Sequence, residues 1–381
     1  MSRQAAQAVT LTPDLTLLAL GATLLAVGLV AITSASVGYA EAHHGNMWYL
    51  SQRHGVYLAI ALTAGAICYQ VPTEFWHRTS WLALLLTSLL LIVVLVPGVG
   101  KSVNGSQRWL ALGSMTLQPS ELAKAAMILF LSSYLVRQGE ALRESWQGLM
   151  RPMMILGMVA VLLLAEPDFG AAVILLATAF GMLFLAGMKL LHLTVLLALT
   201  GVLGTFLIKA APYRLQRLIA YTDPWSDPFG SGFQLIQSLI AFGRGEWTGV
   251  GLGNSVQKLF YLPEAHTDFV FSIWAEETGF IGATLLIAIF FALVVRIFTL
   301  GRTALEQDRP YAAYVCFGIA LMFSGQAFVN MGVSAGLLPT KGLTLPLISY
   351  GGTSVIVSCA LLGIVLRVAR ELGEPAKGKK R

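Results

Sequence analysis

Ten long apolar runs follow one another along this chain of 381 residues. A hydrocarbon core about 30 Å thick is crossed by about 20 apolar residues in helical form. Helices are expected because a backbone inside lipid must satisfy its own hydrogen bonds. The chain is therefore predicted to be an all-α polytopic membrane protein with about ten transmembrane helices. The runs lie near 15–35, 55–71, 79–97, 120–136, 152–166, 170–187, 190–209, 269–297, 311–335 and 345–368.

The composition excludes several other classes of protein. Only 12% of the residues are charged and 56% are hydrophobic, whereas about a quarter of the residues are charged in a soluble domain. Disorder, a coiled coil and an ordinary cytosolic enzyme are therefore ruled out. The three cysteines lie inside apolar runs without metal-ligand spacing and are expected to fill the core. The net charge of +6 is concentrated after the last run, which favours anionic lipid over nucleic acid as its partner.

The distribution of lysine and arginine orients the helices. With the N-terminus inside, most basic residues fall on the cytoplasmic side, and the short outer loops hold only Arg53, Lys101, Arg108 and Lys341. The expected organisation is a single membrane domain over 1–381. It has a short cytoplasmic N-terminus at 1–14, a long outer loop at 209–268 between helices 7 and 8, and a basic cytoplasmic tail at 369–381.

Two segments on the outer side have a pattern of apolar and basic residues that is not typical of simple connecting loops. Within the long loop, residues 233–242 are apolar at helical spacing and predict an amphipathic helix lying on the outer leaflet. Arg214 and Arg217 precede it, three residues apart and hence on one helical face. The segment 101–118 mixes apolar residues with Arg108 and is interpreted as a partly re-entrant or interfacial piece.

Three titratable side chains, Glu264, His266 and Asp268, lie within five residues and directly before a long apolar run. Asp268 or the neighbouring Thr267 fits the N-cap of the next helix, where the helix dipole favours a carboxylate. A carboxylate at the mouth of a bundle is equally suited to act as a general base toward a lipid-borne substrate. A metal site is a weaker alternative, because three ligands so close in sequence give little signal.

A second polar cluster, Glu121 and Lys124, begins the fourth apolar run, with its members on one helical face. One interpretation is a local ion pair that makes the charges tolerable in the membrane. In the other, Lys124 lines a polar cavity, as intramembrane charges usually do. Arg108, just upstream, would then meet a diphosphate with its two-pronged guanidinium.

Two further carboxylates and one broken segment complete the polar positions. Asp168 begins an apolar run, where helix capping is the default interpretation. Glu276 lies about two turns after Asp268, so the two carboxylates are expected to share one cavity. The segment 338–354 is interrupted by prolines and glycines. Broken helices expose backbone groups and recur at binding sites, although a structural kink explains the pattern as well.

Five segments carry a family resemblance. They are QRWLALGSMTLQPSELAK (107–124), AEPDFG (165–170), YRLQRLIAYTDPWSDPFGSGFQLIQS (213–238), GRGEWTGVGLGNSVQKLFYLPEAHTDFVFSIWAEETG (243–279) and GLLPTKGLTLPLISYGGTS (336–354). Together they resemble the SEDS family of shape, elongation, division and sporulation proteins, over nearly the whole chain and in order. GNSVQKL and LPEAHTD are most similar to the division members from Gram-negative bacteria.

The resemblance implies a ten-helix peptidoglycan glycosyltransferase of the bacterial inner membrane. It would polymerise lipid II into β-1,4 strands on the periplasmic face at the division septum. The family's essential aspartate falls on Asp268, as catalytic base or metal-assisted base. The candidate cations for the substrate diphosphate are Arg108, Lys124, Arg214, Arg217 and Lys341, and structural or supporting roles fall to Glu121, Asp168, Glu264, His266 and Glu276.

Inversion at the sugar needs a base for the acceptor hydroxyl and positive charge for the leaving diphosphate. A divalent cation, Mg²⁺ or Mn²⁺, can share this task at a site that the sequence does not define. No organic cofactor is expected. The resemblance also implies FtsI, a class B penicillin-binding protein, as partner transpeptidase, with the FtsQ–FtsL–FtsB complex and FtsN as activators.

Two other functions fit the same residues. A lipid II flippase would use broken helices and the intramembrane charges of Lys124 and Glu276, but the polar groups crowd toward the outer side. A non-catalytic scaffold that recruits FtsI would not need the carboxylate of Asp268.

Overall fold

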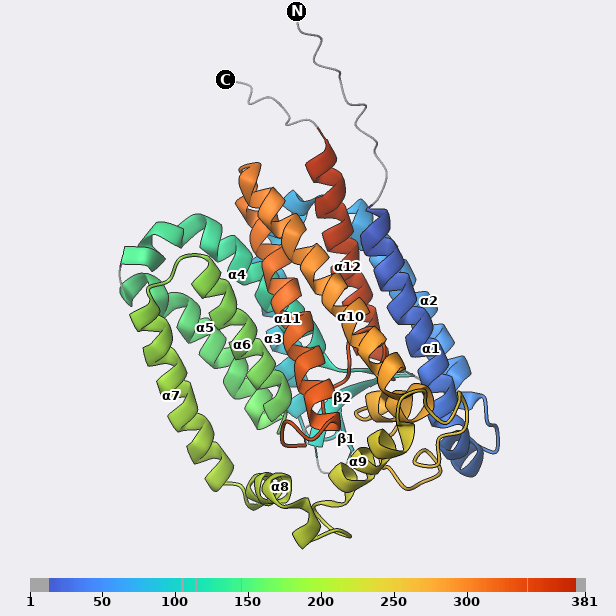
Figure 1. The fold of residues 1–381 in the computed structure, drawn as a ribbon. Helices are drawn as coiled ribbons and strands as arrows, with labels where there is room; N and C mark the ends of the chain where they lie inside the picture. The colour runs from blue at the N-terminus through green and yellow to red at the C-terminus, as the bar shows by residue number, and fades with distance from the viewer. Residues whose placement is uncertain (1–13, 104–105, 114, 145, 341, 375–381) are drawn as a thin grey trace, which may run out of the picture.

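The computed structural model describes residues 14–374, apart from 104–105, 114, 145 and 341 and the side chains of 103, 112, 140–144 and 213–214. Ten helices of 17 to 37 residues form the bulk of the described chain, and α1 begins at the same end of the bundle at which α12 ends (Figure 1). Their bounds are α1 (Leu15–His44), α2 (Tyr49–Gln70), α3 (Thr73–Leu95), α4 (Pro119–Glu144), α5 (Trp146–Ala165), α6 (Phe169–Leu185), α7 (Leu190–Lys209), α10 (Val270–Glu306), α11 (Pro310–Ser334) and α12 (Gly352–Gly373).

The ten helices coincide with the ten predicted apolar runs. Seven of those in the described chain are long and apolar enough to cross a membrane, and α6 is a shorter apolar helix. The prediction of a polytopic helical membrane protein is confirmed. The last run differs at its start, because residues 345–351 are not helical and α12 begins only at Gly352.

Helix starts follow capping chemistry. Asp14 accepts a hydrogen bond from the Leu17 amide (2.9 Å) at the start of α1, and its carboxylate pairs with Arg296 of α10 (2.5 Å). Proline, which needs no amide partner in the first turn, begins α4 and α11.

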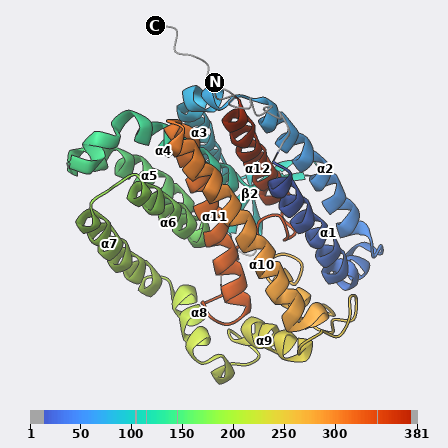
Figure 2. The same cartoon turned by 45° about the horizontal axis from the view of Figure 1, so that its top comes forward.

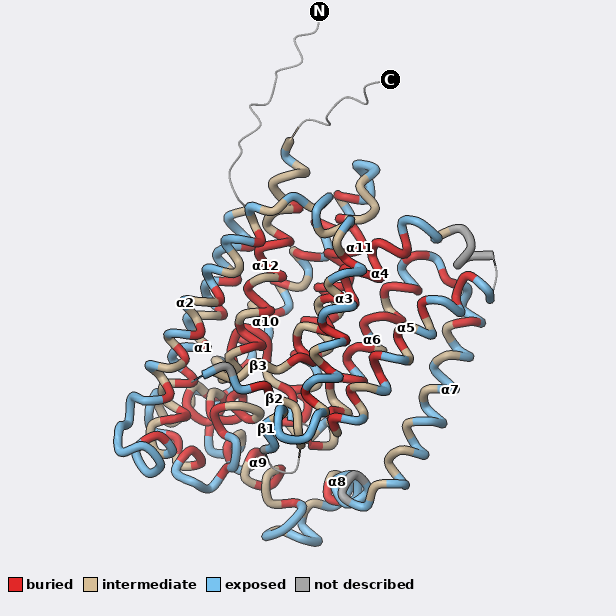
Figure 3. The backbone as a smooth tube through the Cα atoms, turned by 180° about the vertical axis from the view of Figure 1, so that it is seen from behind, coloured by how far each residue is buried: buried red, intermediate tan, exposed pale blue. Residues whose placement is uncertain are grey.

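Burial varies strongly between the helices. Most of the apolar window of α11 and of α12 is buried, whereas α7 has His192 as its only buried residue in the described chain. Figures 2 and 3 show α7 standing apart from the bundle, with pale exposed surface along its length. The core therefore lies around α4, α6, α10, α11 and α12.

A small antiparallel sheet forms the segment that was predicted to be a partly re-entrant or interfacial piece. Its strands are β1 (Gly100–Val103), β2 (Ser106–Leu112) and β3 (Met115–Leu117), in the order β1-β2-β3. Lys101 pairs with Trp109, and Ala111 pairs with Thr116. The sheet lies toward the end of the bundle opposite the start of α1 (Figures 1 and 3). The Asn-Gly dipeptide at 104–105 in the sequence is a hairpin signal, and the interpretation as a re-entrant or interfacial piece did not use it.

The long loop between α7 and α10 contains α8 (Pro212–Thr222), the 3-10 turn η1 (Pro224–Ser226) and α9 (Phe233–Gly245). The amphipathic helix predicted at 233–242 exists as α9, and its apolar side packs on protein. Leu235 and Ile236 are buried, and the Ser238 hydroxyl lies 2.6 Å from the Ser272 hydroxyl and donates to the Ser334 carbonyl (2.6 Å). The helix therefore packs against α10 and α11.

Candidate active site

A cavity of about 760 Å³ lies where the sheet meets the ends of several helices. Its walls come from α2, from the sheet, from α8 and from the starts of α4, α6, α9 and α12. Further lining residues are 264, 267–269, 340, 342–344 and 350–351. This volume suits a substantial ligand. The charged side chains that line it are Arg53, Lys101, Arg108, Glu121, Asp168, Arg217, Glu264 and Asp268.

The backbone around Asp268 is held in a tight turn. The carbonyl of Glu264 accepts hydrogen bonds from the amides of Thr267, Asp268 and Phe269 (3.1–3.2 Å), and Glu264 itself has a positive φ of 54°. Asp268 precedes α10 and makes no side-chain cap, since the N-cap position belongs to Phe269. The capping alternative for Asp268 is therefore not what the structure shows.

Residues far along the chain pack closely around Asp268. The side-chain amide nitrogen of Asn330, a buried residue of α11, donates to the backbone carbonyls of Asp268 (2.8 Å) and Leu343 (2.6 Å). A Cβ atom built on Gly342 would lie 2.9 Å from Oδ2 of Asp268. In addition, the Tyr350 amide donates to the His266 carbonyl (3.0 Å). The broken segment 338–351 is thus bound directly to the loop that carries the carboxylate.

The surroundings set the acidity of Asp268. The pKa of this carboxyl is raised to about 7, first by burial and then by the charge of Glu264, while Arg217 and Arg108 act to lower it. A carboxylate with a pKa near the working pH is suited to accept a proton in catalysis. Asp268 therefore combines a cavity position with the acidity of a general base.

Arg108 reaches the same cavity from β2. Its guanidinium donates to the carbonyls of Glu166 (3.1 Å) and Pro167 (2.5 Å) and lies 3.8 Å from the carboxylate of Asp168. Asp168 caps α6 as predicted, accepting from the Ala171 amide at 3.2 Å. These contacts fix the arginine while leaving it in the cavity wall. Arg217 lines the cavity from α8.

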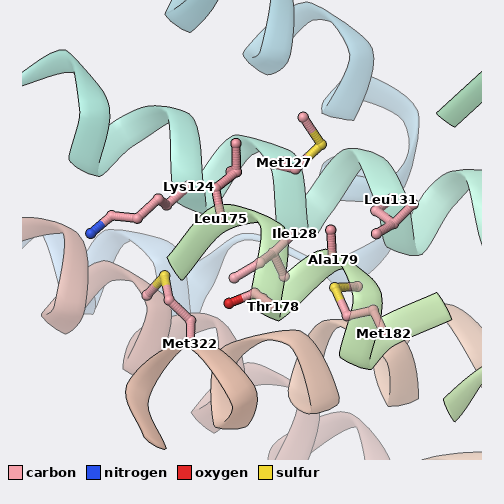
Figure 4. A pocket seen from close by; sticks show the side chains of 9 residues that line it. All are labelled: Lys124, Met127, Ile128, Leu131, Leu175, Thr178, Ala179, Met182 and Met322. Carbon is pink, nitrogen blue, oxygen red and sulfur yellow. The ribbon is translucent and has the colours of Figure 1, made fainter. Parts of the chain in front are cut away.

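Lys124 is placed differently from the predicted diphosphate ligand. Its ammonium forms an ion pair with Glu121 at 2.8 Å, and both side chains are buried. Lys124 borders a separate void of about 10 Å³ between α4, α6 and α11, in which its neighbours are the apolar side chains Met127, Ile128 and Met322 (Figure 4). Glu121 alone reaches the large cavity. The geometry is that of the local ion pair.

Glu276 does not share the cavity with Asp268, contrary to the expectation from their spacing. It is fully buried, pairs with Arg244 (3.2 Å) and accepts from the amides of Val256 (3.2 Å) and Gln257 (3.3 Å). The cause is the loop 246–262, which packs on this part of α10 and covers it. Glu276 therefore anchors the loop that leads to Asp268.

The remaining predicted residues are distributed as follows. Glu264 lies in the cavity wall, and its carboxylate accepts from the Thr267 hydroxyl at 2.7 Å. The ring of His266 lies between Tyr39 and Tyr350, with ring centroids 5.2 and 5.6 Å away. Lys341 and the side chain of Arg214 lie outside the described residues.

The carboxylates and histidines do not by themselves make a metal site. Within the described ranges, no three His, Cys, Asp or Glu side chains are grouped so that they could hold an ion. Mg²⁺ is commonly bound by one or two carboxylates together with substrate phosphates. A cation here would therefore depend on the substrate for most of its ligands.

Sequence reasoning missed Asn330, Gly342 and Arg53 as parts of the site. Asn330 carried one signal, because a polar amide inside an apolar run of 25 residues needs a buried partner. The sequence predicts Arg53 in a short outer loop, but the residue belongs to α2.

The model of the "cell cycle protein" family, which joins FtsW, RodA and SpoVE, matches residues 14–374. A probable peptidoglycan glycosyltransferase FtsW of Hahella chejuensis is 50% identical over 95% of this chain and 91% of its own. Its counterpart in Pseudomonas fluorescens is 51% identical over 91% of this chain and 86% of its own.

Solved structures agree in fold. One chain, described under the structural coordination of polymerization and crosslinking by a peptidoglycan synthase complex, has a TM-score of 0.77 and 33% identity, covering 95% of this chain and 98% of that one. The rod shape determining protein RodA of Thermus thermophilus has a TM-score of 0.70 and 30% identity, covering 96% and 99%. By sequence and by fold, this chain belongs to the SEDS family of FtsW, RodA and SpoVE.

Proposed function

We propose that the chain is a peptidoglycan glycosyltransferase that polymerises lipid II during septal cell-wall synthesis. One observation carries the proposal: the carboxylate of Asp268 and the guanidinium groups of Arg108 and Arg217 line one cavity at one end of a membrane bundle. The names of the relatives, which are probable peptidoglycan glycosyltransferases, support the same reaction.

The reaction joins two lipid-linked sugars. Asp268 takes the proton of the acceptor 4-hydroxyl, and the acceptor oxygen forms a bond to the anomeric carbon of the donor. The bond from that carbon to the diphosphate oxygen breaks, and the polyprenyl diphosphate leaves with the electron pair. Attack from the opposite face converts the α-linked donor into a β-1,4 product.

Charge placement fits this sequence of events. The donor diphosphate is attached directly to the reacting carbon, so it must lie close to the base. Arg108 and Arg217 are the cavity cations whose charge lowers the pKa of Asp268. They stabilise the negative charge that develops on the leaving diphosphate, and a fixed guanidinium needs little reorganisation to do so. Arg108 is already held by two backbone carbonyls.

A divalent cation bound mainly by phosphate oxygens would add positive charge at the same place. Among the four cavity carboxylates, Asp168 and Asp268 could complete its ligands. No step above is assigned to it.

The location and the partners follow from the same proposal. The cavity end of the bundle faces the periplasm and both termini face the cytoplasm, consistent with the predicted excess of basic residues there. The transpeptidase partner is FtsI, and the FtsQ–FtsL–FtsB complex and FtsN act as regulators at the septum. The similarity to a chain from a peptidoglycan synthase complex supports a penicillin-binding protein as the partner.

The test uses the purified protein with its transpeptidase partner and lipid II in detergent. Wild type should form glycan polymer, and Asp268→Ala and Asp268→Asn should not. Asp227→Asn, on an exposed residue of the loop between α8 and α9, is the matched control. Lipid movement across liposomes without polymer would support a flippase. Normal division with Asp268→Ala at normal protein level would support a scaffold.

A further inference from the structure

The cavity has a second cationic face that the reaction at Asp268 does not use. Side chains alternate between the two faces of a strand, and paired residues of neighbouring strands share a face. Lys101 of β1 pairs with Trp109 of β2, so these two lie on the face opposite Arg108. Thr116 of β3 pairs with Ala111 and joins the same face. Because Lys101, Trp109 and Thr116 all line the cavity together with Arg108, both faces of the sheet border it.

Helix α2 extends this face beyond β3. The Thr116 amide donates to the Tyr57 hydroxyl (3.4 Å), and the guanidinium carbon of Arg53 lies 5.9 Å from the centroid of the Tyr57 ring. Arg53 and Tyr57 both line the cavity. The second cationic face therefore consists of Lys101, Trp109, Thr116, Tyr57 and Arg53, with its two cations at opposite ends and aromatic rings between them.

The proposed reaction supplies a second anion of matching chemistry. In the first coupling, both donor and acceptor are lipid II, and each carries a diphosphate. The donor diphosphate is bonded to the reacting carbon, but the acceptor diphosphate lies two sugar rings away from the hydroxyl that reacts. It cannot therefore be neutralised by the same arginines that stabilise the leaving group beside Asp268.

We propose that the second cationic face binds the diphosphate of the acceptor lipid II, with Arg53 as the main ligand and Lys101 as the second. This inference rests on the proposed glycosyltransferase function. A guanidinium suits a phosphate group because it donates two parallel hydrogen bonds, whereas an ammonium acts as a point charge. The indole of Trp109 provides a flat apolar surface for the sugars between the diphosphate and the reacting hydroxyl.

The test separates the two substrates. A lipid II whose 4-hydroxyl is capped can act only as donor. In a phosphonate analogue, carbon replaces the anomeric oxygen. The analogue keeps the charged oxygens of both phosphorus atoms, but it has no leaving group and acts only as acceptor. Arg53→Gln should raise KM for the acceptor about 10- to 100-fold, the loss expected for a hydrogen-bonded charge, and leave KM for the donor within about twofold. Lys101→Gln should act in the same direction with a smaller factor.

Controls keep folding and function apart from this assignment. Arg53→Lys should recover part of the acceptor affinity, and Arg78→Gln, an exposed cation paired with Glu74 at the start of α3, should change neither KM. An equal rise in both KM values, or a fall in kcat alone, would overturn the proposal. So would a loss for Arg53→Gln that disappears when the stem peptide of the acceptor is shortened, because the recognised anion would then be a peptide carboxylate. No coupling by wild type would refute the glycosyltransferase function itself.

Discussion

Replacing Asp268 by asparagine should make the protein more stable and inactive at once. Burial raises the pKa of the carboxyl to about 7 from its ordinary value of 3.8. Each pH unit of difference corresponds to about 1.36 kcal/mol, so ionised Asp268 costs the folded protein at most about 4 kcal/mol. Asparagine has nearly the same shape and no charge to bury.

The sign follows from proton linkage. Between pH 3.8 and about 7 the folded protein holds the proton that the unfolded chain has released, so wild-type stability falls as the pH rises. The advantage of Asp268→Asn should therefore be near zero at pH 4 and grow to a plateau above pH 7. One kcal/mol shifts Tm by about 2–4 °C in domains of 150–250 residues and by less in a longer chain. We expect a difference of several degrees at pH 8.

The assay is thermal unfolding of both proteins in detergent between pH 5 and 8, beside lipid II polymerisation at the same pH values. Wild-type activity should rise with pH and level off above about 7, and the variant should lose at least about 100-fold. For Asp227→Asn, the change in stability with pH should have the opposite sign, because hydrogen bonds from Ser231 lower the pKa of Asp227. A pH-independent difference between Asp268→Asn and wild type, or a less stable variant at pH 8, would refute the reasoning.

Five further perturbations test the residues around the site and the divalent cation. Asn330→Leu removes the donor shared by two backbone carbonyls and should lower kcat about 10- to 100-fold with a small change in KM. Gly342→Ala crowds the Asp268 carboxylate and should have the same effect on kcat and KM. Unchanged kinetics would contradict both predictions. Lys124→Met leaves Glu121 buried without its partner and should cost about 3–5 kcal/mol in thermal unfolding, with recovery on adding Glu121→Gln. Burial raises the pKa of Glu166 to about 8, so Glu166→Gln should stabilise the protein increasingly from pH 5 to 9 and be neutral near pH 4.5. Chelation by EDTA should slow polymerisation without changing Tm, and an unchanged rate would exclude the cation.

The sequence anticipated those features that depend on local pattern. Long apolar runs predicted the ten helices, because a helix satisfies its backbone hydrogen bonds within a single segment, as a chain in lipid requires. Asp168 was expected to cap a helix from its place after Pro167, and it does so. The sheet at 100–117 was missed because its strands are short. They do not show the long hydrophobic periodicity by which a helix is recognised in a sequence.

Pairings between distant segments were harder to anticipate. Spacing along one helix placed Glu276 near Asp268, but the loop 246–262 folds over that part of α10. The partners of Glu276 are the Arg244 guanidinium from the end of α9 and backbone amides from the loop. For Glu121 and Lys124, the sequence allowed two interpretations, a local ion pair or a lysine that lines a polar cavity. The burial of Lys124 between α4, α6 and α11 decided for the ion pair.

By itself, the sequence determined the class of protein, the number of long helices and the residue types available for chemistry, since these depend on hydrophobicity and on covalent structure alone. Only the tertiary structure decided which charges meet. Asp268, Arg108 and Arg217 line one cavity. Asn330 holds the loop of Asp268 in place by hydrogen bonds to the carbonyls of Asp268 and Leu343. In β2, the side chains of Arg108 and Trp109 lie on opposite faces of the sheet. The strength of an electrostatic interaction depends on the distance between the charges and on their burial, and the order of the residues along the chain specifies neither.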